Sequence, residues 1–315
     1  MSKGVILGID TSNYTTSVAL MSTDGELLAN SRKLLAVKQG ERGLRQSDAV
    51  FSHVKNLPEL MLEAGKILDG REIAAVGVSE RPRSVDGSYM PCFLTGVALA
   101  TGISSTHNAP LYRFSHQCGH IMAALYSCKR SDLLSTDIAA FHVSGGTTEL
   151  LRVKRAAVGF DAEKVGGTLD LNAGQVIDRI GVMMGLPFPA GKYLEELALQ
   201  NKERVPKKKP ALKGMDVSLS GLENLAGKIF SETANRSLTA AFVLEYIAEA
   251  LSSMSEEYIS RYGNTPILYA GGVMRNSLIR SRLSEKFDAC FAEPDMSSDN
   301  AVGIAALALE AYSKK

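Results

Sequence analysis

One pattern of apolar strands and polar turns occurs twice along the chain. Its first copy has apolar runs at residues 5–9 and 16–21, separated by a polar turn, and then a turn at Asp24-Gly25 before a third apolar stretch. Its second copy is an apolar run at residues 138–143 that breaks at Ser144-Gly-Gly and resumes as a strand up to Val153. Asp-Gly is a typical hairpin turn, so both copies predict strands joined by polar turns. The repeat favours two similar α/β domains that face a cleft, and the backbone amides of such turns can hold phosphate oxygens.

Helical periodicity fills the intervals between the strands. Apolar residues between 173 and 184 recur at spacings of three and four, which predicts a helix that ends at Gly185. Asp178 lies off the apolar face of this helix, one turn from Gly174 and from Gly181. Two interpretations of Asp178 stay open at this point: it contacts a ligand that approaches over the two glycines, or it is a solvated acid beside closely packed helices.

A second helix is expected over about residues 240–262, ending at Gly263, and a buried strand over residues 266–270. The strand runs into Gly271-Gly272 and then into a helix that begins after Asn276. A strand, two glycines and a helix start are typical of nucleotide sites, because glycine lets the backbone pass close to a base or ribose. Asn276 either touches such a ligand or merely caps the helix.

His116 and His120 are four residues apart, so a helix would place both imidazoles on one face, close enough to share a divalent metal. No acid lies between them, which excludes the water-activating glutamate of an H-E-x-x-H metalloprotease. A third ligand is needed, and Asp299 is a candidate because two histidines and a carboxylate form a common iron or zinc site. Asp299 is also explained as the cap of the last helix.

Length and charge narrow the possible partners. The chain has 315 residues, which is enough for two domains. Its net charge is +1, from 35 Lys and Arg against 34 Asp and Glu, so nucleic acid could bind only through a local patch. The clearest patch, called the basic segment below, is equally well explained as a solvated loop. It consists of Lys202, Arg204, Lys207, Lys208, Lys209 and Lys213.

Cysteine usage and the first residues indicate the compartment. The four cysteines show no C-x-x-C spacing, which favours reduced thiols. The chain enters a strand pattern at once, without a signal peptide, and no apolar run approaches the roughly 18 residues that span a bilayer. We therefore expect a cytoplasmic protein that is not inserted in a membrane.

Eight ordered motifs resemble those of the TsaD (Gcp) family, the tRNA threonylcarbamoyl-transferases long misnamed O-sialoglycoprotein endopeptidases. The resemblance runs nearly from end to end of the chain. The motifs are Leu-Gly-Ile-Asp-Thr-Ser at 7–12, Ser-His-Val-Lys-Asn-Leu-Pro at 52–58, His-Gln-Cys-Gly-His at 116–120, Val-Ser-Gly-Gly-Thr-Thr-Glu at 143–149, Gly-Thr-Leu-Asp at 167–170, Lys-Gly-Met-Asp-Val-Ser-Leu-Ser-Gly-Leu at 213–222, Ala-Gly-Gly-Val at 270–273 and Ser-Asp-Asn at 298–300.

The resemblance implies the actin-like fold shared with sugar kinases and Hsp70 (ASKHA), with two duplicated α/β domains around a cleft. The expected domains are residues 1–112 plus 297–315 and residues 113–296. By resemblance His116, His120 and Asp299 are metal ligands. The same resemblance assigns the remaining site residues to the threonylcarbamoyl-adenylate: His142, Val143, Ser144, Gly145 and Gly146 as its loop, and Asp178, Gly191 and Asn276 as contacts to its nucleoside part.

The family reaction moves a threonylcarbamoyl group from threonylcarbamoyl-AMP to the exocyclic amine of the adenosine 3′ of the anticodon, in tRNAs that read codons beginning with A. The resemblance implies one divalent metal, iron or zinc, and an adenine nucleotide as substrate, either threonylcarbamoyl-AMP or Mg-ATP. It also implies tRNA, TsaB-like and TsaE-like proteins as partners, and a homodimer or heterodimer. Because the acyl carbon is already activated, the work of the protein is positioning and charge stabilisation.

The chain departs from the family pattern in its first turn. The family carries Thr-Ser-Cys-Asp-Glu-Thr there, whereas this chain has Thr-Ser-Asn-Tyr-Thr-Thr at residues 11–16. Asn13 and Tyr14 stand in place of Cys-Asp and Thr15 in place of Glu, so that neither acid is present. Residues 80–91 also replace a Gly-Pro-Gly loop, Cys118 occupies the metal helix, and Thr147-Thr148 replaces His-Thr. Loss of the acids removes a candidate general base or organiser of the acceptor site.

Three functions remain open because of these departures. The leading one is transfer of threonylcarbamoyl to tRNA. The second is a carbamoyltransferase that acts on a small molecule, and the third is a non-catalytic partner that binds nucleotide and metal in the tRNA-modification complex. Activity without RNA would indicate the second function, and binding without turnover would indicate the third.

Overall fold

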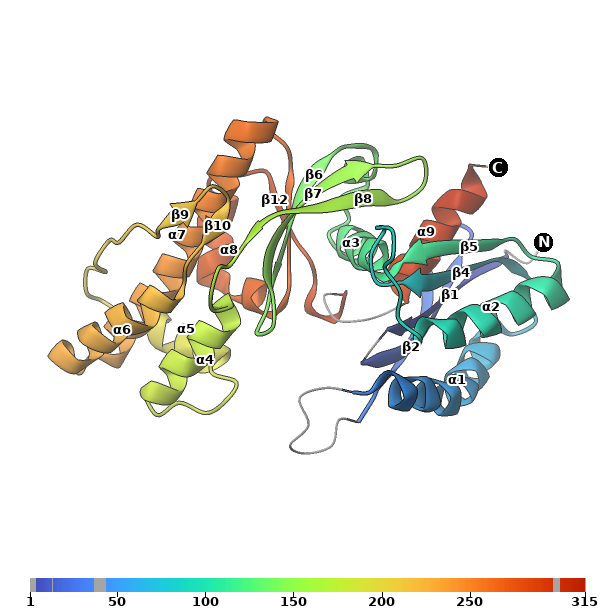
Figure 1. Ribbon diagram of the computed structural model, residues 1–315, viewed down its shortest axis with the longest axis horizontal. Helices are drawn as coiled ribbons and strands as arrows, with labels where there is room; N and C mark the ends of the chain where they lie inside the picture. Colours follow the sequence, from blue (N-terminus) through green and yellow to red (C-terminus); the bar gives the residue numbers. More distant parts are fainter. Residues whose placement is uncertain (1–3, 13, 37–43, 297–300, 315) are drawn as a thin grey trace. The chain divides into compact units, whose positions relative to one another are not determined.

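The computed structural model describes residues 4–12, 14–36, 44–296 and 301–314. The chain forms two compact units, and each is built on a five-stranded mixed sheet with helices packed against it. Figure 1 labels most of the strands and helices. The first unit comprises Met1–Leu134, Lys154–Ala162 and Asp295–Lys315, and the second comprises Ser135–Val153 and Glu163–Pro294.

The sheet of the first unit has the strand order β3-β2-β1-β4-β5. The central strand β1 pairs antiparallel with β2 and parallel with β4, and β3 and β5 extend the two sides. The turn predicted at Asp24-Gly25 joins β2 to β3, and Gly25 has a φ of 89°. The strands are β1 (Val5–Ser12), β2 (Thr15–Ser22), β3 (Leu27–Leu34), β4 (Ile73–Arg81) and β5 (Leu111–Ser115).

Strand β1 is buried on both faces, which explains why it is an almost unbroken apolar run. Its odd positions Val5, Leu7 and Ile9 pack in one cluster with α1 and α2, while Ile6 packs on the opposite face with α9. Figure 1 shows α1 and α2 together on one side of this sheet. The helices of this unit are α1 (Gln46–Leu68), α2 (Phe93–His107), α3 (His116–Ser127) and α9 (Val302–Ser313).

Helices α3 and α9 pack with their backbones almost in contact. A Cβ atom on Gly303 would lie 1.8 Å from the carbonyl oxygen of Gly119 and 2.7 Å from the amide nitrogen of Ala123. Only a residue without a side chain fits this approach. The packing keeps residues 113–134 in the first unit, whereas the boundary at residue 112 drawn from the sequence assigns them to the second domain.

The far end of the β7–β8 hairpin also belongs to the first unit, a feature that the sequence did not suggest. Arg155 pairs with Glu310 of α9, and the Lys314 Nζ donates a hydrogen bond to the carbonyl oxygen of Ala157 over 2.7 Å. The chain therefore passes from one unit to the other twice along this one hairpin. Its strands are β7 (Thr148–Arg155) and β8 (Phe160–Gly167).

The sheet of the second unit repeats the topology of the first, with the order β12-β11-β6-β7-β8. Its central strand β6 pairs antiparallel with the next strand, β7, and parallel with β11, as β1 does with β2 and β4. The duplication expected from the repeated strand–turn–strand pattern is thereby confirmed at the level of topology. The remaining strands are β6 (Ile138–Val143), β9 (Leu212–Lys213), β10 (Asp216–Val217), β11 (Ile267–Ala270) and β12 (Ala289–Phe291).

Helices of the second unit follow the predicted pattern with small shifts at their starts. The helix expected at 173–184 is α4 and ends before Gly185. The helix expected from about 240 already starts at Arg236, because the side chain of Asn235 caps it by accepting a hydrogen bond from the Leu238 amide. In the first unit, α9 begins at Val302 with Ala301 in the N-cap position, where the sequence favoured a cap at Asp299; Asp299 lies outside the described residues. The helices are α4 (Ala173–Met183), α5 (Gly191–Leu199), α6 (Ser220–Thr233), α7 (Arg236–Tyr262) and α8 (Ser277–Ser284).

Within the described ranges, no helix has both the length and the apolar character needed to cross a membrane. Short 3₁₀ turns complete the description of the chain. They are η1 (Ser131–Ser135), η2 (Gly272–Arg275) and η3 (Pro294–Met296).

Asp170 explains the Gly-Thr-Leu-Asp motif as a structural element. Its carboxylate accepts hydrogen bonds from the backbone amides of Leu219 and Ser220 and from the Ser220 hydroxyl at the start of α6. Although burial opposes ionisation, the bonds from Ser220 and Leu219 lower the pKa of Asp170 below its ordinary value. The motif at 167–170 thus fixes the motif at 213–222 to the sheet.

His53 of α1 is fully buried and ties the helix to β2. Its Nδ1 lies 2.8 Å from the hydroxyl oxygen of Thr16, which also accepts a bond from the Asn56 amide over 3.1 Å. Burial lowers the pKa of His53 below its ordinary value of 6.5, although the charge of Asp10 and a bond with the backbone at Ser12 act in the opposite direction. His53 is therefore neutral in the folded protein at neutral pH.

Replacing Gly303 by alanine tests the α3–α9 packing. Because the new methyl group would overlap the backbone of α3, we expect Gly303→Ala to lower the free energy of unfolding by about 2–3 kcal/mol, as in other overpacked cores. Urea denaturation followed by circular dichroism measures the change. Gly102→Ala in α2 is the matched control, because nothing lies within 4 Å of its Cβ position, and it should gain up to about 1 kcal/mol of helix propensity. Equal stability of the two variants would contradict the packing.

His53 predicts a specific loss of stability in acid. The unfolded chain binds a proton at His53 with the ordinary pKa, whereas the folded chain resists it, so the unfolding free energy should fall as the pH drops below about 6.5. Urea denaturation between pH 5 and 8 measures this slope. His53→Gln should flatten the slope, while His107→Gln, at an exposed position of α2, should leave it unchanged. An unchanged slope in His53→Gln would show that another group dominates.

Candidate functional site

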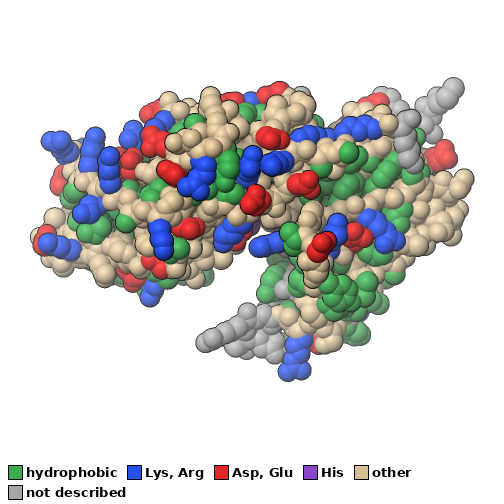
Figure 2. Space-filling view, turned by 45° about the horizontal axis from the view of Figure 1, so that its top comes forward, with side chains coloured by type: hydrophobic (Ala, Val, Ile, Leu, Met, Phe, Trp, Pro, Cys, Tyr) green, Lys and Arg blue, Asp and Glu red, His purple; other side chains and the backbone are tan. Residues whose placement is uncertain are grey.

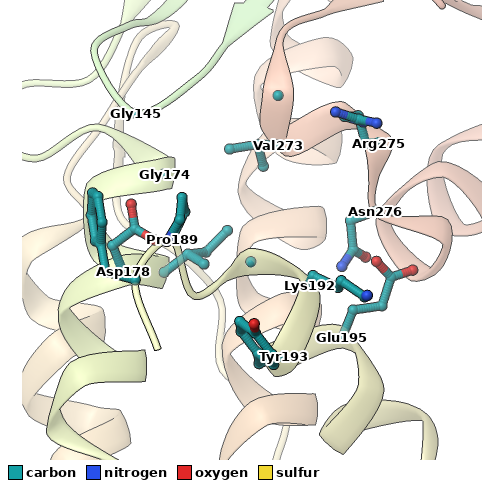
Figure 3. Close-up of a pocket in the computed structure, with 14 residues that line it drawn as sticks. Gly145, Gly174, Asp178, Pro189, Lys192, Tyr193, Glu195, Val273, Arg275 and Asn276 are labelled. Carbon is teal, nitrogen blue, oxygen red and sulfur yellow. The ribbon is translucent and has the colours of Figure 1, made fainter. Parts of the chain in front are cut away.

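A cavity of about 760 Å³ opens in the second unit, within the range of ligand pockets. Segments far apart in the sequence line it: the loop after β6, the faces of α4 and α5, and the turn between β11 and α8. Figure 3 shows Asp178 on one side of the cavity and Lys192, Glu195 and Asn276 on the other. The lining residues are Gly145, Gly174, Ile177, Asp178, Phe188, Pro189, Gly191, Lys192, Tyr193, Glu195, Gly272, Val273, Arg275 and Asn276.

The glycine-rich loop after β6 is a tight turn that closes on its own serine. The Ser144 amide donates to the carbonyl oxygen of Thr147 over 2.7 Å, and the Ser144 hydroxyl oxygen accepts from the amides of Gly146 and Thr147. Gly145 at the tip lines the cavity, while His142 and Val143 end strand β6. Amides of such turns can hold phosphate oxygens, but the amide of Gly146 already donates to the Ser144 hydroxyl oxygen.

Helix α4 begins directly against this loop. A Cβ atom on Gly174 would lie 2.7 Å from both Cα and N of Gly145, so a side chain at position 174 would push the helix away from the turn. The Gly174 amide also donates to the Ser144 carbonyl oxygen over 3.2 Å. The glycine one turn before Asp178 therefore serves loop packing, and it brings the carboxylate to the cavity.

Asp178 lines the cavity and is held in place from α5. Its Oδ1 accepts a hydrogen bond from the Ala190 amide over 2.7 Å, just before Gly191 begins α5. Gly191 lines the same cavity. Two of the three residues that the resemblance assigned to the nucleoside therefore meet at one pocket, and one carboxylate oxygen of Asp178 is used to fix its side chain.

Asn276 caps a helix and also lines the cavity. Its Oδ1 accepts from the Ile279 amide over 3.1 Å and so caps α8, and its side chain is buried and lines the cavity. Glu195 of α5 secures the same helix start, because its Oε1 accepts from the Ser277 amide over 2.7 Å. The cap orients the amide group of Asn276 toward the pocket from a rigid helix end.

Several pocket residues were missed by the sequence analysis. Phe188, Lys192, Tyr193, Glu195 and Arg275 line the cavity without having been singled out. Arg275 stands next to Asn276 and Lys192 next to Gly191, so proximity to the chosen residues was the available signal. Phe188 is 73% exposed, and a large apolar side chain exposed beside a cavity is an indication of binding that only the structure provides.

The two histidines lie on α3 in the first unit, as the helix prediction required. Their ring centroids are 4.3 Å apart at an interplanar angle of 74°. The Ser115 hydroxyl oxygen accepts from the Cys118 amide over 3.2 Å and caps the helix directly before His116. The Nδ1 of His116 lies 2.9 Å from Oδ2 of Asp10, a fully buried carboxylate of β1 that the sequence analysis had not assigned a role.

The donor set of α3 fits a divalent transition metal in part. Two adjacent imidazoles are typical ligands, and a carboxylate on the far ring nitrogen of a ligating histidine is the usual supporting contact. Asp299, the expected third ligand, lies outside the described residues. Across residues 4–12, 14–36, 44–296 and 301–314, no cluster of three or more His, Cys, Asp and Glu side chains could hold a metal ion. The full ligand set therefore stays a prediction.

Solved structures with similar folds support the actin-like architecture. HypF from T. kodakarensis matches with a TM-score of 0.60 at 13% identity, over 99% of this chain and 48% of that one. A ROK-family glucokinase from Streptomyces griseus, in complex with glucose and AMPPNP, matches with a TM-score of 0.51 at 12% identity, over 98% of this chain and all of that one. The expected ASKHA fold class is confirmed by these likenesses and by the duplicated sheets.

Sequence relatives identify the family. The chain is 30% identical to a tRNA N6-adenosine threonylcarbamoyltransferase of Streptococcus suis, over its full length and 94% of that protein. It is 27% identical to the protein of the same name from Neorickettsia sennetsu, over 98% of this chain and 94% of the relative. The family model described as tRNA N6-adenosine threonylcarbamoyltransferase matches residues 27–306. The chain therefore belongs to the family of tRNA N6-adenosine threonylcarbamoyltransferases.

Proposed function

We propose that the protein transfers a threonylcarbamoyl group from threonylcarbamoyl-AMP to N6 of the adenosine 3′ of the anticodon, in tRNAs that read codons beginning with A. The observation that carries the proposal is the cavity of the second unit. It gathers Gly145, Asp178, Gly191 and Asn276, four residues expected at the nucleotide, in a chain of this family. Because its acceptor would be tRNA, we place the activity in the cytoplasm.

The pocket residues would hold and orient the adenylate. The second carboxylate oxygen of Asp178 suits a ribose hydroxyl, and the exposed ring of Phe188 suits a flat base. In the reaction N6 attacks the carbamoyl carbon, the bond from that carbon to the phosphate oxygen breaks, AMP leaves, and N6 gives up a proton. An activated acyl group needs chiefly correct placement beside the amine, and a rigid pocket supplies that placement.

The first turn contributes no acid to this chemistry. Tyr14, at the turn between β1 and β2, is 42% exposed, and Asn13 lies outside the described residues. A tyrosine here offers a hydroxyl group and a stacking surface where the family pattern has a carboxylate. We propose that solvent or the substrate removes the proton from N6, so that the placement of the two substrates determines the rate.

A divalent ion, iron or zinc, would be held by His116, His120 and Asp299. When bound, it supplies Lewis-acid polarisation of a carbonyl group or grips the threonyl part. The residues of this chain do the remaining work there. The Ser115 cap fixes the start of α3, and the four-residue spacing keeps both imidazoles on one face.

The basic segment is the candidate contact for the phosphate backbone of tRNA. All six of its Lys and Arg residues are exposed, in a largely irregular stretch between α5 and α6. Figure 2 shows Lys and Arg side chains projecting from the left end of the second unit, where Figure 1 places β9, β10 and α6. Such contacts bind without sequence preference and weaken with salt. The acceptor adenosine must be turned out of its loop to reach a protein site.

Partner proteins of the TsaB and TsaE type would dock on the first unit, as part of a homodimer or heterodimer. Phe51 and Leu62 of α1 are 65% and 71% exposed, and three helical turns separate them, so they share one face. Val54 of α1 and Leu94 of α2 are also more than half exposed. Figure 2 shows hydrophobic side chains gathered on this unit. Exposed apolar groups of this kind mark interaction sites.

Incubation with threonylcarbamoyl-AMP and unmodified tRNA tests the proposed function. We expect threonylcarbamoyl-adenosine in the digested tRNA, detected by mass spectrometry, with TsaB-like and TsaE-like proteins added in parallel reactions. A tRNA with another base at the acceptor position is the control and should remain unmodified. Acyl transfer to a small molecule without RNA would indicate the alternative carbamoyltransferase. Nucleotide binding without any turnover would indicate a non-catalytic partner.

Asp178→Asn tests the nucleotide pocket. The amide can still accept the bond from Ala190, but it removes the charge that would accept bonds from the ribose, so we expect AMP to bind about tenfold more weakly. Isothermal titration calorimetry measures the affinity. Glu232→Gln, an exposed carboxylate on α6 outside the cavity, is the matched control and should bind as the parent does. Equal AMP affinity of both variants would remove Asp178 from the site.

A further inference from the structure

Asp10 is a buried charge in the central strand of the first unit. Its side chain is 0% exposed, and a carboxylate in such a position is costly unless its oxygens are hydrogen-bonded. Strand β4 supplies one partner, because the Ser79 hydroxyl donates to Oδ1. Helix α3 supplies the other, because the Nδ1 of His116 lies 2.9 Å from Oδ2. Both oxygens are therefore engaged, and they point in fixed directions.

The contact sets the tautomer of His116. A carboxylate only accepts hydrogen bonds, so Nδ1 must carry the proton in this contact, and the lone pair of the neutral ring is then on Nε2. Nε2 is the nitrogen opposite the buried strand. The ring of Phe93, with its centroid 6.1 Å from that of His116, packs on another side of the imidazole.

The backbone of His116 is fixed independently of the ring. The Ser115 hydroxyl oxygen accepts from the Cys118 amide over 3.2 Å, and the Ser84 hydroxyl donates to the Ser115 hydroxyl oxygen over 2.9 Å. Since the cap holds the helix start, the contact with Asp10 is left to set the rotation of the imidazole. The two constraints can be separated by mutation.

We propose that Asp10 is a positioning residue for divalent-metal binding: it holds Nδ1 of His116 so that Nε2 presents its lone pair to the ion beside His120. The inference rests on the proposed metal site at α3. Ser79 of β4 acts on His116 only through Asp10, because its hydroxyl restrains the Asp10 carboxylate. Supporting contacts of this kind typically change metal affinity 10- to 100-fold.

Metal affinity of the full chain tests the proposal. The protein is stripped with a chelator and titrated with Zn²⁺ in competition with a chromophoric chelator, and Co²⁺ absorption reports ligand geometry. We expect Asp10→Asn to weaken Zn²⁺ binding at least tenfold and to change the Co²⁺ spectrum. Ser79→Ala should weaken binding by a smaller factor. Asp132→Asn, an exposed carboxylate of the same unit that pairs with Arg130, should bind as the parent does.

His116→Ala separates failure of the positioning role from failure of the metal site. If His116→Ala binds Zn²⁺ as tightly as the parent, the proposed metal site itself is wrong. If His116→Ala loses binding while Asp10→Asn retains parental affinity and spectrum, the positioning role is overturned. Circular dichroism of each variant establishes that it is folded.

The metal-free parent protein gives a second readout that needs no variant at Asp10. Two-bond ¹H–¹⁵N NMR spectra distinguish the two neutral tautomers of histidine, and His116→Ala assigns the signal. We expect His116 with its proton on Nδ1. A proton on Nε2 would overturn the proposal, even if Asp10→Asn does not fold.

Discussion

Burial of both faces of a central strand is the constraint on which each unit depends. Strand β1 packs its odd and even positions against different helices, and it pairs antiparallel on one side and parallel on the other. Strand β6 has the same pairing arrangement. A strand of this kind must be apolar along its length, so polar chemistry gathers where the strand ends. The turn at Ser144-Gly145 directly follows such an end, that of β6, and its Gly145 lines the cavity.

Asp10 is the exception to this rule and shows what the exception requires. It lies within the buried run of β1 yet carries a charge, and the protein provides a hydroxyl on one oxygen and an imidazole on the other. Such a group costs stability unless both contacts persist. The contact with His116 links this buried carboxylate to the proposed site at α3.

Much of the fold could be predicted from the sequence because its signals are local. The repeated strands, the helix ending before Gly185 and the two-histidine helix depend on periodicity and on turn residues within a few positions. The domain boundary could not be predicted in this way. It depends on the approach of Gly303 to Gly119, a contact between residues 184 positions apart that no local pattern encodes. The ordered motifs identified the family, and the residues that the resemblance assigned to the nucleoside, Asp178, Gly191 and Asn276, all line the cavity of the second unit.

The pocket shows the same division between local and distant signals. Local spacing left the roles of Asp178 and Asn276 undecided. A solvated acid adequately explains Asp178, and a helix cap adequately explains Asn276. The structure shows that Asn276 is a cap and a pocket residue at once, and that Asp178 is fixed by a backbone amide from another helix. Phe188 carried no signal, and Arg275 carried none beyond its position next to Asn276, because the role of each depends on which distant segments meet beside it.

The division of the chain into units has a consequence for how either could be obtained alone. The first unit comprises three separate stretches and the second comprises two, with the middle stretch of the first supplied by the tip of the β7–β8 hairpin. No single cut releases a whole unit: a fragment ending at Leu134 lacks both α9 and the hairpin tip, and would expose the face of β1 that α9 covers. Isolating the second unit intact would require a designed turn in place of residues 154–162.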